Sequence, residues 1–552
     1  MYKMDKDKKG NSIKRRRLTA LKSERSSFNP LYKDISTNLL PMAGRFNTTD
    51  RNKRRDSTII DQAGAQAHKI LVSGMMAGMT SPARPWHRLQ TTDPQLNDYA
   101  PVKKWLDDVS GILRDIFARS NFYRAQTTTY QEVTSFGTSA SLILPNFDNV
   151  IHCHSMTTGQ YWIAADNLGY VNTLYREWEM TVESIVAEFG LDNVSRSIKD
   201  LYNKGNYDDW ITVVQAIEPR KDRDHTKRDN LNMPISSCTF EAGEGKEDVY
   251  LRESGFKEFP GRVARWDLSG GDVYATNCPG IEAFRAIEQL QHQSIDKGKA
   301  IKYMADPAII VPNTMALGDY LPGGVSTYSG DGAQKVQNAR DVRIDLNALL
   351  LDIQDVRQRI DTHFYADLFQ MITRSTDRQR TATEIAERHE EKLLMLGPVL
   401  ERLHHEDLAP SVERTFRYAF DAGILPPVPK EMEGADIKIE FISVLAQAQK
   451  AVGLSAMDQL LMTVGNVAKL KPDVIDKVNG DAWIDKASDI LGVDPDLVVA
   501  NDQVQLVRQE RAEQQQAQQM ADMLPSTAQA AKTLSETNTR DPNALTDMFS
   551  QV

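Results

Sequence analysis

Two long amphipathic segments of similar length constrain the fold of this chain more than any other feature. Apolar residues recur every three or four positions in 279–304 and again in 347–372, which predicts two long helices. At 1.5 Å per residue, helices of about 24 and 26 residues would be about 36 and 39 Å long. Between them, residues 305–346 contain five glycines, three prolines and short β-like runs. The pattern therefore predicts a stalk of two helices with a small irregular β excursion at its tip.

A short basic loop follows the second predicted helix. It carries Arg374, Arg378 and Arg380 and leads directly into another helical pattern. Such a loop can bind phosphate, pair with carboxylates or remain solvated. Pairing with Glu384 or Glu387 at the helix start is one alternative, because the helix dipole also favours carboxylates there.

The charge of the chain is distributed unevenly, which bears on any contact with nucleic acid. The net charge is −10, yet residues 1–55 hold sixteen Lys or Arg against five Asp or Glu. The remainder is therefore strongly acidic and repels nucleic acid in general, so a contact with DNA must be local. Arg15, Arg16 and Arg17 lie in the basic N-terminal region, for which a solvated arm and a phosphate-binding arm are both open readings.

Length and composition bound the class of protein. A chain of 552 residues predicts two to four structural units, and 41% apolar with 26% charged residues is a globular mixture. The longest apolar stretch is about half of the ~20 residues that a bilayer crossing needs, and no secretory signal is expected. Cys153, Cys238 and Cys278 lie far apart, which favours a reducing compartment and opposes a disulfide framework or a zinc site.

The rest of the chain alternates between helical and strand-like regions. Residues 56–80 predict a helix in which Gly74 and Gly78 permit close packing, and residues 101–120 predict a second helix. A mixed α/β region follows from 135 to 278, with a turn at 167–169. Further predictions are a short helix ending at Gly190, helices over 382–396 and on to Asp421, a mainly helical 440–500, and a Gln-rich, partly flexible end.

Three short motifs could suggest chemistry, but each has a simpler interpretation. In "HCHS", His152 and His154 share one face of a strand while Cys153 faces away, so two metal ligands lack a third. The run "HHED" at 404–407 is interpreted as the polar face of a helix, and "AGEGKED" at 242–248 lacks the first glycine of a phosphate loop. We expect no cofactor, no metal and no enzymatic activity.

Three stretches resemble the portal, or head-to-tail connector, family of short-tailed phages. They are "DSTIIDQAGAQAHKILVSGMMAGMTSPARPW", "FPGRVARWDLSGGDVYATNCPG" and "RTATEIAERHEEKLLMLGPVLERLHHEDLAPSVERTF" with the "GILPPVP" that follows. The resemblance covers about residues 25–500. One departure is Tyr274-Ala275, where the family usually has a Tyr-Gly step.

The resemblance implies a mixed α+β, largely helical portal-type fold that assembles into a ring. The implied parts are a basic N-terminal arm (1–24), an α/β wing (25–279), stem helices (280–304 and 347–372), a clip (305–346), a tunnel loop (373–381), a wing or tunnel helix (382–399), a helical crown (400–500) and a Gln-rich tail (501–552).

The resemblance also implies a function and partners. The ring would be a dodecamer at one capsid vertex that docks the terminase large subunit, conducts and retains double-stranded DNA, and then attaches the tail adaptor. Scaffold, major capsid protein and internal core or ejection proteins would be further partners, with no membrane involved; the chain would be in the host cytoplasm during assembly and then in the virion.

Individual residues acquire expected roles from the same resemblance. Arg374, Arg378 and Arg380 would form a positive collar in the channel, and the candidate docking residues of the clip are Asp319, Tyr320, Tyr328 and Lys335. The alternative is a non-portal virion protein, such as an internal ejection or scaffold-like protein, that binds DNA through its basic N-terminus.

Overall fold

The chain divides into two compact units, residues 1–92 with 105–449 and residues 93–104 with 450–552. A computed structural model describes residues 9–46, 59–93, 96–97, 99–227, 229–242, 250–305, 309–310, 337–338, 345–373, 396–432, 434–442, 460–468, 471, 478–484, 504 and 506–515. In the second unit, the described residues include helical segments at 460–468 and 506–515, and Arg508 pairs with Asp481 at 2.6 Å. The first unit contains all the sheets described below.

Two antiparallel sheets form the centre of the first unit, and the mixed α/β region predicted from the sequence is confirmed. One has the strand order β4-β5-β6-β7-β8 and the other the order β3-β2-β9. The strands are β2 (Thr138–Asn146), β3 (Val150–Met156), β4 (Tyr161–Ala165), β5 (Val171–Thr181), β6 (Trp210–Pro219), β7 (Ile235–Glu241), β8 (Arg252–Phe256) and β9 (Gly261–Arg265).

Local turn and cap predictions in this region are also confirmed. The turn at 167–169 joins β4 to β5, and Gly169 adopts the left-handed φ of 84° that the turn requires. The short helix α7 (Val182–Phe189) begins where the Thr181 hydroxyl accepts a hydrogen bond from the Ser184 amide at 3.3 Å. It stops at Gly190, as the sequence predicts.

Helix α6 (Phe122–Phe136) packs against β2 and β3, and α3 (Ala63–Met79) packs against α6. In α5 (Ala100–Arg119), the Ser110 hydroxyl accepts a hydrogen bond from the Leu89 amide at 3.1 Å. The helix predicted over 56–80 ends as expected, but residues 59–62 are not helical and α3 begins at Ala63. Close packing at Gly74 is confirmed, because a Cβ there would lie only 2.2 Å from the Phe369 ring.

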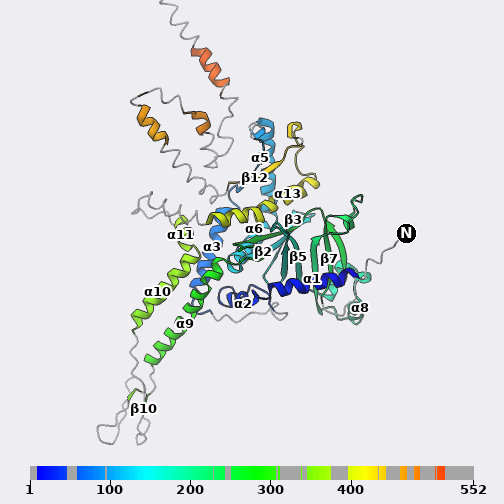
Figure 1. The fold of residues 1–552 in the computed structure, drawn as a ribbon, viewed down its shortest axis with the longest axis vertical. Coiled ribbons are helices and arrows are strands. Elements are labelled where there is room, and N and C mark those ends of the chain that lie inside the picture. Colours follow the sequence, from blue (N-terminus) through cyan, green and yellow to red (C-terminus); the bar gives the residue numbers. More distant parts are fainter. Residues whose placement is uncertain are drawn as a thin grey trace, which may run out of the picture. The chain divides into compact units, whose positions relative to one another are not determined.

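The basic N-terminal segment packs on the protein instead of forming a solvated arm over its described part. Helix α1 (Lys9–Arg25) lies along the five-stranded sheet (Figure 1), and Leu18 and Leu21 join a buried cluster with Trp162 and Phe240. The solvated arm is therefore wrong for residues 9–25. The physical reason is that the two leucines bury apolar surface on a sheet whose pairing is not visible in the local sequence. The chain continues into α2 (Asn29–Asn38).

The predicted stalk is confirmed in its first helix and corrected in its second. Helix α9 (Pro279–Ala305) matches the prediction to within one residue. The segment predicted as one helix over 347–372 is instead α10 (Leu346–His363) and α11 (Ala366–Thr373), separated at Phe364 and Tyr365. Tyr365 has a left-handed φ of 51°, which an α-helix cannot contain.

Figure 1 shows α9 and α10 running side by side away from the sheets. Of the excursion between them, the structure describes β10 (Ile309–Ile310) and β11 (Gln337–Asn338), which pair antiparallel. Residues 306–308, 311–336 and 339–344 of the excursion lie outside the described residues. So do residues 243–248 of the "AGEGKED" motif and residues 382–395 of the helix predicted over 382–396.

The Tyr274-Ala275 step requires no glycine. Ala275 does not adopt a positive φ, and its amide donates a hydrogen bond to the Thr138 hydroxyl at 2.9 Å. The Ala275 methyl group instead lies against Gly137, where an added Cβ would be 2.8 Å away. The close contact at the turn before α9 therefore requires a glycine at position 137 and not at position 275.

Candidate functional site

The base of the stalk is packed into the first unit. Phe284, Ile287 and Leu290 of α9 and Ile353 and Val356 of α10 are buried. Fully burying such side chains stabilises a fold by about 1.5–3 kcal/mol each. The base of the helix pair is therefore held by apolar packing.

A short segment before α3 ties the two stalk helices together. The Gln291 side chain of α9 accepts hydrogen bonds from the amides of Ile60 and Asp61 at 2.8 and 3.0 Å, and its Nε2 donates to the Asp61 carbonyl at 2.8 Å. The Asp61 carboxylate accepts two further bonds from Arg357 of α10, the shorter at 2.6 Å. One aspartate and one glutamine thus link three segments that are far apart in sequence.

The joint between α10 and α11 rests on α3 and α6. Phe364 is buried with its ring 5.7 Å from the His68 ring, edge to face. The His68 Nε2 lies 2.9 Å from the Thr134 hydroxyl and 2.8 Å from the Ser135 hydroxyl, and burial lowers its pKa to about 4. His68 is therefore neutral near pH 7 and serves as a hydrogen-bonded core residue.

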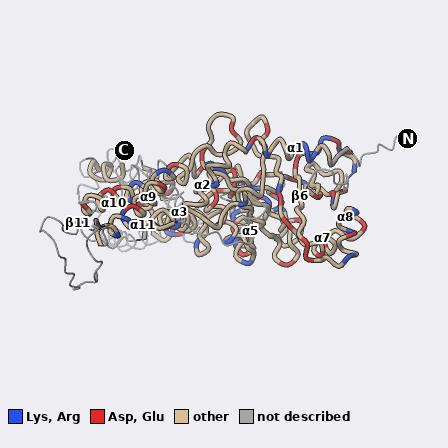
Figure 2. Tube along the Cα trace, turned by 90° about the horizontal axis from the view of Figure 1, so that it is seen from below, with Lys and Arg blue, Asp and Glu red and all other residues tan. Residues whose placement is uncertain are grey.

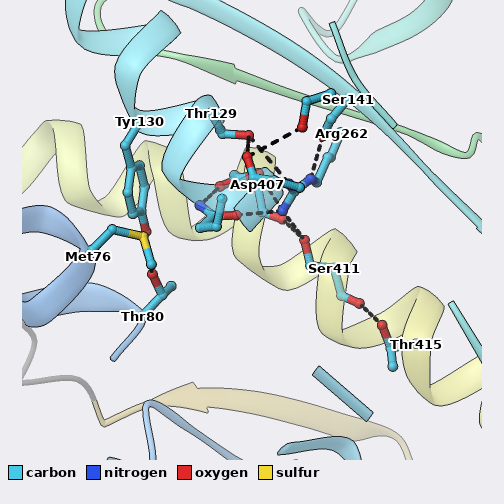
Figure 3. A network of polar contacts seen from close by, with 12 residues as sticks. Met76, Thr80, Thr129, Tyr130, Ser141, Arg262, Asp407, Ser411 and Thr415 are labelled. Carbon is cyan, nitrogen blue, oxygen red and sulfur yellow. Dashed lines mark hydrogen bonds and ion pairs between the residues drawn. The ribbon is translucent and has the colours of Figure 1, made fainter. Parts of the chain in front are cut away.

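A fully buried ion pair joins the three-stranded sheet to a π-helical turn at residues 404–408 (Figure 3). The Arg262 guanidinium of β9 lies 3.4 Å from the Asp407 carboxylate, and both side chains are completely inaccessible. Gln126 of α6 bridges them, since its Nε2 donates to Asp407 at 2.5 Å and its Oε1 accepts from Arg262 at 2.6 Å. Ser141 and Ser411 accept further bonds from Arg262 at 2.5 and 3.2 Å.

Arg265, also on β9, forms a similar ion pair with Glu406, the residue before Asp407. Arg265 donates to both oxygens of Glu406, with the shortest distance 2.5 Å, and to the carbonyl of Gly169 at 2.9 Å. Burial raises the pKa of Glu406, while the hydrogen bonds and charge of Arg265 oppose that shift. Two arginines of one strand thus hold two neighbouring carboxylates.

The interpretation of "HHED" as the polar face of a helix therefore fails at Glu406 and Asp407, whose carboxylates pair with buried arginines, while His405 is exposed. Residues 404–408 form a π-helical turn between helical residues 396–403 and α13 (Ala409–Asp421). Asp407 is fully buried, and His404 stacks on Phe441 with ring centroids 4.2 Å apart. Phe441 belongs to β12 (Ile437–Phe441), which pairs with β1 (His87–Thr91). Residues 400–442 belong to the first unit, together with the sheets.

The N-terminal arginines divide into two kinds. Arg15 is half-buried, with its guanidinium 6.0 Å from the Phe240 ring centroid and one nitrogen donating to the Glu241 carbonyl at 3.4 Å. Arg16 and Arg17 are exposed on α1. Figure 2 shows Lys and Arg residues along this helix. The remaining predicted contact residues, the loop arginines and the four clip residues, lie outside the described part of the chain.

The histidine pair is arranged as its strand position predicts. His152 and His154 share one face of β3, with ring centroids 4.6 Å apart, and Cys153 is buried. Burial and the nearby Arg176 lower the pKa of His154 to about 4. Within the described residues, no group of three His, Cys, Asp or Glu could hold a metal ion. No helix in that part of the chain is long and apolar enough to cross a bilayer.

The first unit thus combines antiparallel sheets with a helix pair that is packed at its base. Residues 13–499 match the family described as "Bacteriophage head to tail connecting protein". The chain is 48% identical to the probable portal protein of Bordetella phage BPP-1 and 42% identical to the portal protein of Salmonella phage epsilon15, each over 96% of both chains. The chain therefore belongs to the portal, or head-to-tail connecting, family of bacteriophages.

Membership of this family confirms the resemblance inferred from the three sequence stretches. The chain is a structural connector of the phage virion and not an enzyme. The sequence interpretation missed Arg262, Arg265, Gln126 and Asp61 as anchoring residues. No local signal could have identified them, because each acts with partners that are distant in the chain.

Proposed function

We propose that the chain forms a dodecameric ring at one capsid vertex, through which double-stranded DNA is packaged, retained and later released. The observation that supports this best is the helix pair α9–α10, which is packed at its base and leaves the sheets. The description of the matched family supports a head-to-tail junction as the location. The terminase large subunit, scaffold, major capsid protein and internal core or ejection proteins are the proposed partners on the head side.

Negative-stain microscopy of the purified chain tests this proposal. Uniform rings with a central hole are expected without any added cofactor. A protein that remains a 62.1 kDa monomer at micromolar concentration in both low and high salt would contradict it.

The loop after α11 is proposed to line the constriction of that ring. One loop per subunit turns Arg374, Arg378 and Arg380 into a positive collar within an acidic body. Arginines of such a collar bind the phosphates of the DNA backbone, so the contact does not depend on the base sequence. The acidic surface elsewhere repels DNA, which prevents binding so tight that the DNA could not slide.

Replacing all three arginines with Ala should leave rings intact but weaken the retention of packaged DNA. Raised salt should weaken retention by the intact protein in the same way, because phosphate contacts are screened. Normal packaging and retention together with a lower melting temperature would instead identify the arginines as helix-start ion pairs.

The excursion at 305–346 is proposed to dock the terminase first and the tail adaptor later. It lies between the far ends of α9 and α10 in the chain, and its Asp319, Tyr320, Tyr328 and Lys335 offer charged and aromatic contacts. Replacing it with a short Gly-Ser link should keep rings but abolish adaptor binding. Adaptor binding at wild-type strength would assign the docking surface to another segment.

A further inference from the structure

A pocket of about 910 Å³ opens where α1 leads into α2, beside the five-stranded sheet. Figure 1 shows these two helices following one another along the sheets. Residues of both helices line the pocket, together with Trp162 of β4, Glu177 of β5 and Thr212 of β6. Ligand-binding pockets typically have volumes of about 300–1,000 Å³, so this one can hold a ligand larger than a single ion.

The pocket carries an excess of positive charge. Its lining includes four cations and two acids, namely Lys22, Arg25, Lys33, Arg45, Glu177 and Glu179. Lys22 pairs with Glu177, and the lining as a whole has two more positive than negative charges. The net charge of the whole chain is −10, so this local excess has the opposite sign. The pocket therefore attracts anionic groups that the rest of the chain repels.

Arg25 is the residue that most directly indicates an anionic ligand. Its side chain is only 3% exposed, and it forms no ion pair with another described residue. Its guanidinium donates to the Tyr161 carbonyl at 2.7 Å and to the Asn29 side chain at 3.2 Å, and it lies 4.9 Å from the centroid of the Trp162 ring.

All of these partners of Arg25 are neutral. Burying a charge without an opposite charge is costly, and the C-terminus of α1 supplies only a partial negative charge. A bound carboxylate would supply the full negative charge that the described residues do not provide.

The remainder of the lining combines a second cation with apolar surface. Lys33 of α2 is exposed, and it also forms no ion pair with a described residue. Phe46 is half-buried, and it lines the same pocket together with Pro30. Cations bind a carboxylate, whereas an aromatic ring and a proline pack against an apolar side chain. A short peptide can present both kinds of group on neighbouring residues.

We propose that this pocket binds an acidic peptide segment of a partner protein. A carboxylate of the segment contacts Arg25 and Lys33, and a neighbouring apolar side chain packs on Phe46. A small anion alone would leave most of the volume unfilled. Duplex DNA is disfavoured, because a guanidinium that is 3% exposed is out of reach of a rigid backbone and because Glu177 and Glu179 repel its continuous negative charge.

Fluorescence anisotropy with the full chain tests the proposal. The probe is a labelled peptide of two aspartates, one phenylalanine and two glutamates, and the control peptide has Asn and Gln in place of the acids. At low salt in a buffer without phosphate, the acidic peptide should bind about tenfold or more tightly than the neutral one. Equal binding of the two peptides, or no binding of the acidic one, would overturn the proposal.

Substitutions in the pocket identify where the peptide binds. Arg25→Gln removes the charge but keeps a donor for the Tyr161 carbonyl, and it should weaken binding about tenfold or more. Lys33→Gln, at an exposed position, should weaken it about threefold. Lys221→Gln is the matched control, because Lys221 is exposed beyond the opposite end of β6 from Thr212, and its affinity should equal that of the wild type.

Circular dichroism shows whether each variant is folded. If Arg25→Gln does not fold, the exposed Lys33→Gln decides the matter, and an affinity equal to that of the Lys221→Gln control would refute the site.

Competition experiments separate the possible sources of the anionic group. Inorganic phosphate should displace the peptide only at far higher concentration than the unlabelled peptide does, and displacement at equal concentration would identify a small-anion site instead. A short DNA duplex should not displace it. Displacement by the duplex that is lost in Arg25→Gln would identify a nucleic-acid interface and overturn the proposal. The pocket lies within one chain, so peptide binding is expected whether or not the wild-type chain forms rings.

Discussion

The turn around Asp407 and the far half of the stalk, where α9 ends and α10 begins, both carry charged residues, but those around Asp407 are buried and those on the stalk are exposed. Around Asp407 the charges are buried, paired with Arg262 and Arg265 and bridged by Gln126. On the far stalk, both charged and apolar side chains remain exposed. The first region obtains its stability within one chain. The second leaves apolar side chains exposed in the single chain, so mutations in the two regions should affect different measurements.

The largest expected effect is on the buried pair. Asp407→Ala leaves Arg262 charged, buried and without its carboxylate, which typically costs about 3–5 kcal/mol of unfolding free energy. Denaturant unfolding of the purified protein measures this loss. Asp421→Ala is the matched control, because its ion pair with Lys257 is largely exposed and should cost at most about 1 kcal/mol. Equal losses in both variants would refute the contrast between buried and exposed charge.

The next effect concerns the contact that holds α11 on α3. Gly74→Ala should destabilise the protein by about 1–3 kcal/mol, because its Cβ would overlap the Phe369 ring and force repacking. Thermal unfolding measures the change. Gly111→Ala in α5 is the control, since the nearest atom to its Cβ would be 3.8 Å away and alanine favours helix by about 1 kcal/mol. A stabilised Gly74→Ala protein would show that the helices can separate at low cost.

A smaller effect appears only in acid. His87 is fully buried with no hydrogen-bond partner for either ring nitrogen, and burial together with Arg114 lowers its pKa to about 3. The unfolded chain therefore binds a proton that the folded chain rejects, and stability falls as the pH drops below about 6.5 towards 3. His87→Phe should remove about 2 kcal/mol of this loss at pH 5.

Unfolding measured at pH 5 and pH 7 checks this, with the exposed His225→Phe as control. An unchanged difference between the two pH values in His87→Phe would assign the acid sensitivity to other groups.

The smallest effect on stability is expected on the far stalk. Leu351→Ser should change the unfolding free energy by no more than about 0.5 kcal/mol, because the side chain is mostly exposed. The same change should reduce ring formation, which mass photometry measures. A substantial loss of stability without any loss of assembly would mean that Leu351 is covered within its own chain.

Much of the local structure was predictable because its causes are local. The apolar spacing of three and four residues predicts α9 to within one residue, and Asn167-Leu168-Gly169 predicts the turn between β4 and β5. Gly190 ends α7 where expected. The family was also predictable, because the three stretches that resemble it are continuous in the sequence. In each case the determining residues are neighbours along the chain.

Only the tertiary structure decided the remaining features. The break at Tyr365 exists because Phe364 packs beside His68 and Phe369 packs on Gly74, and the local pattern continues through it without interruption. Likewise, "HHED" has the composition of the polar face of a helix. Asp407 is nevertheless buried, because it pairs with Arg262 of β9, which is far away in the sequence. The sequence by itself determined where helices and turns form, since backbone preferences act over a few residues. Which faces are buried depended on partners that only folding brings together.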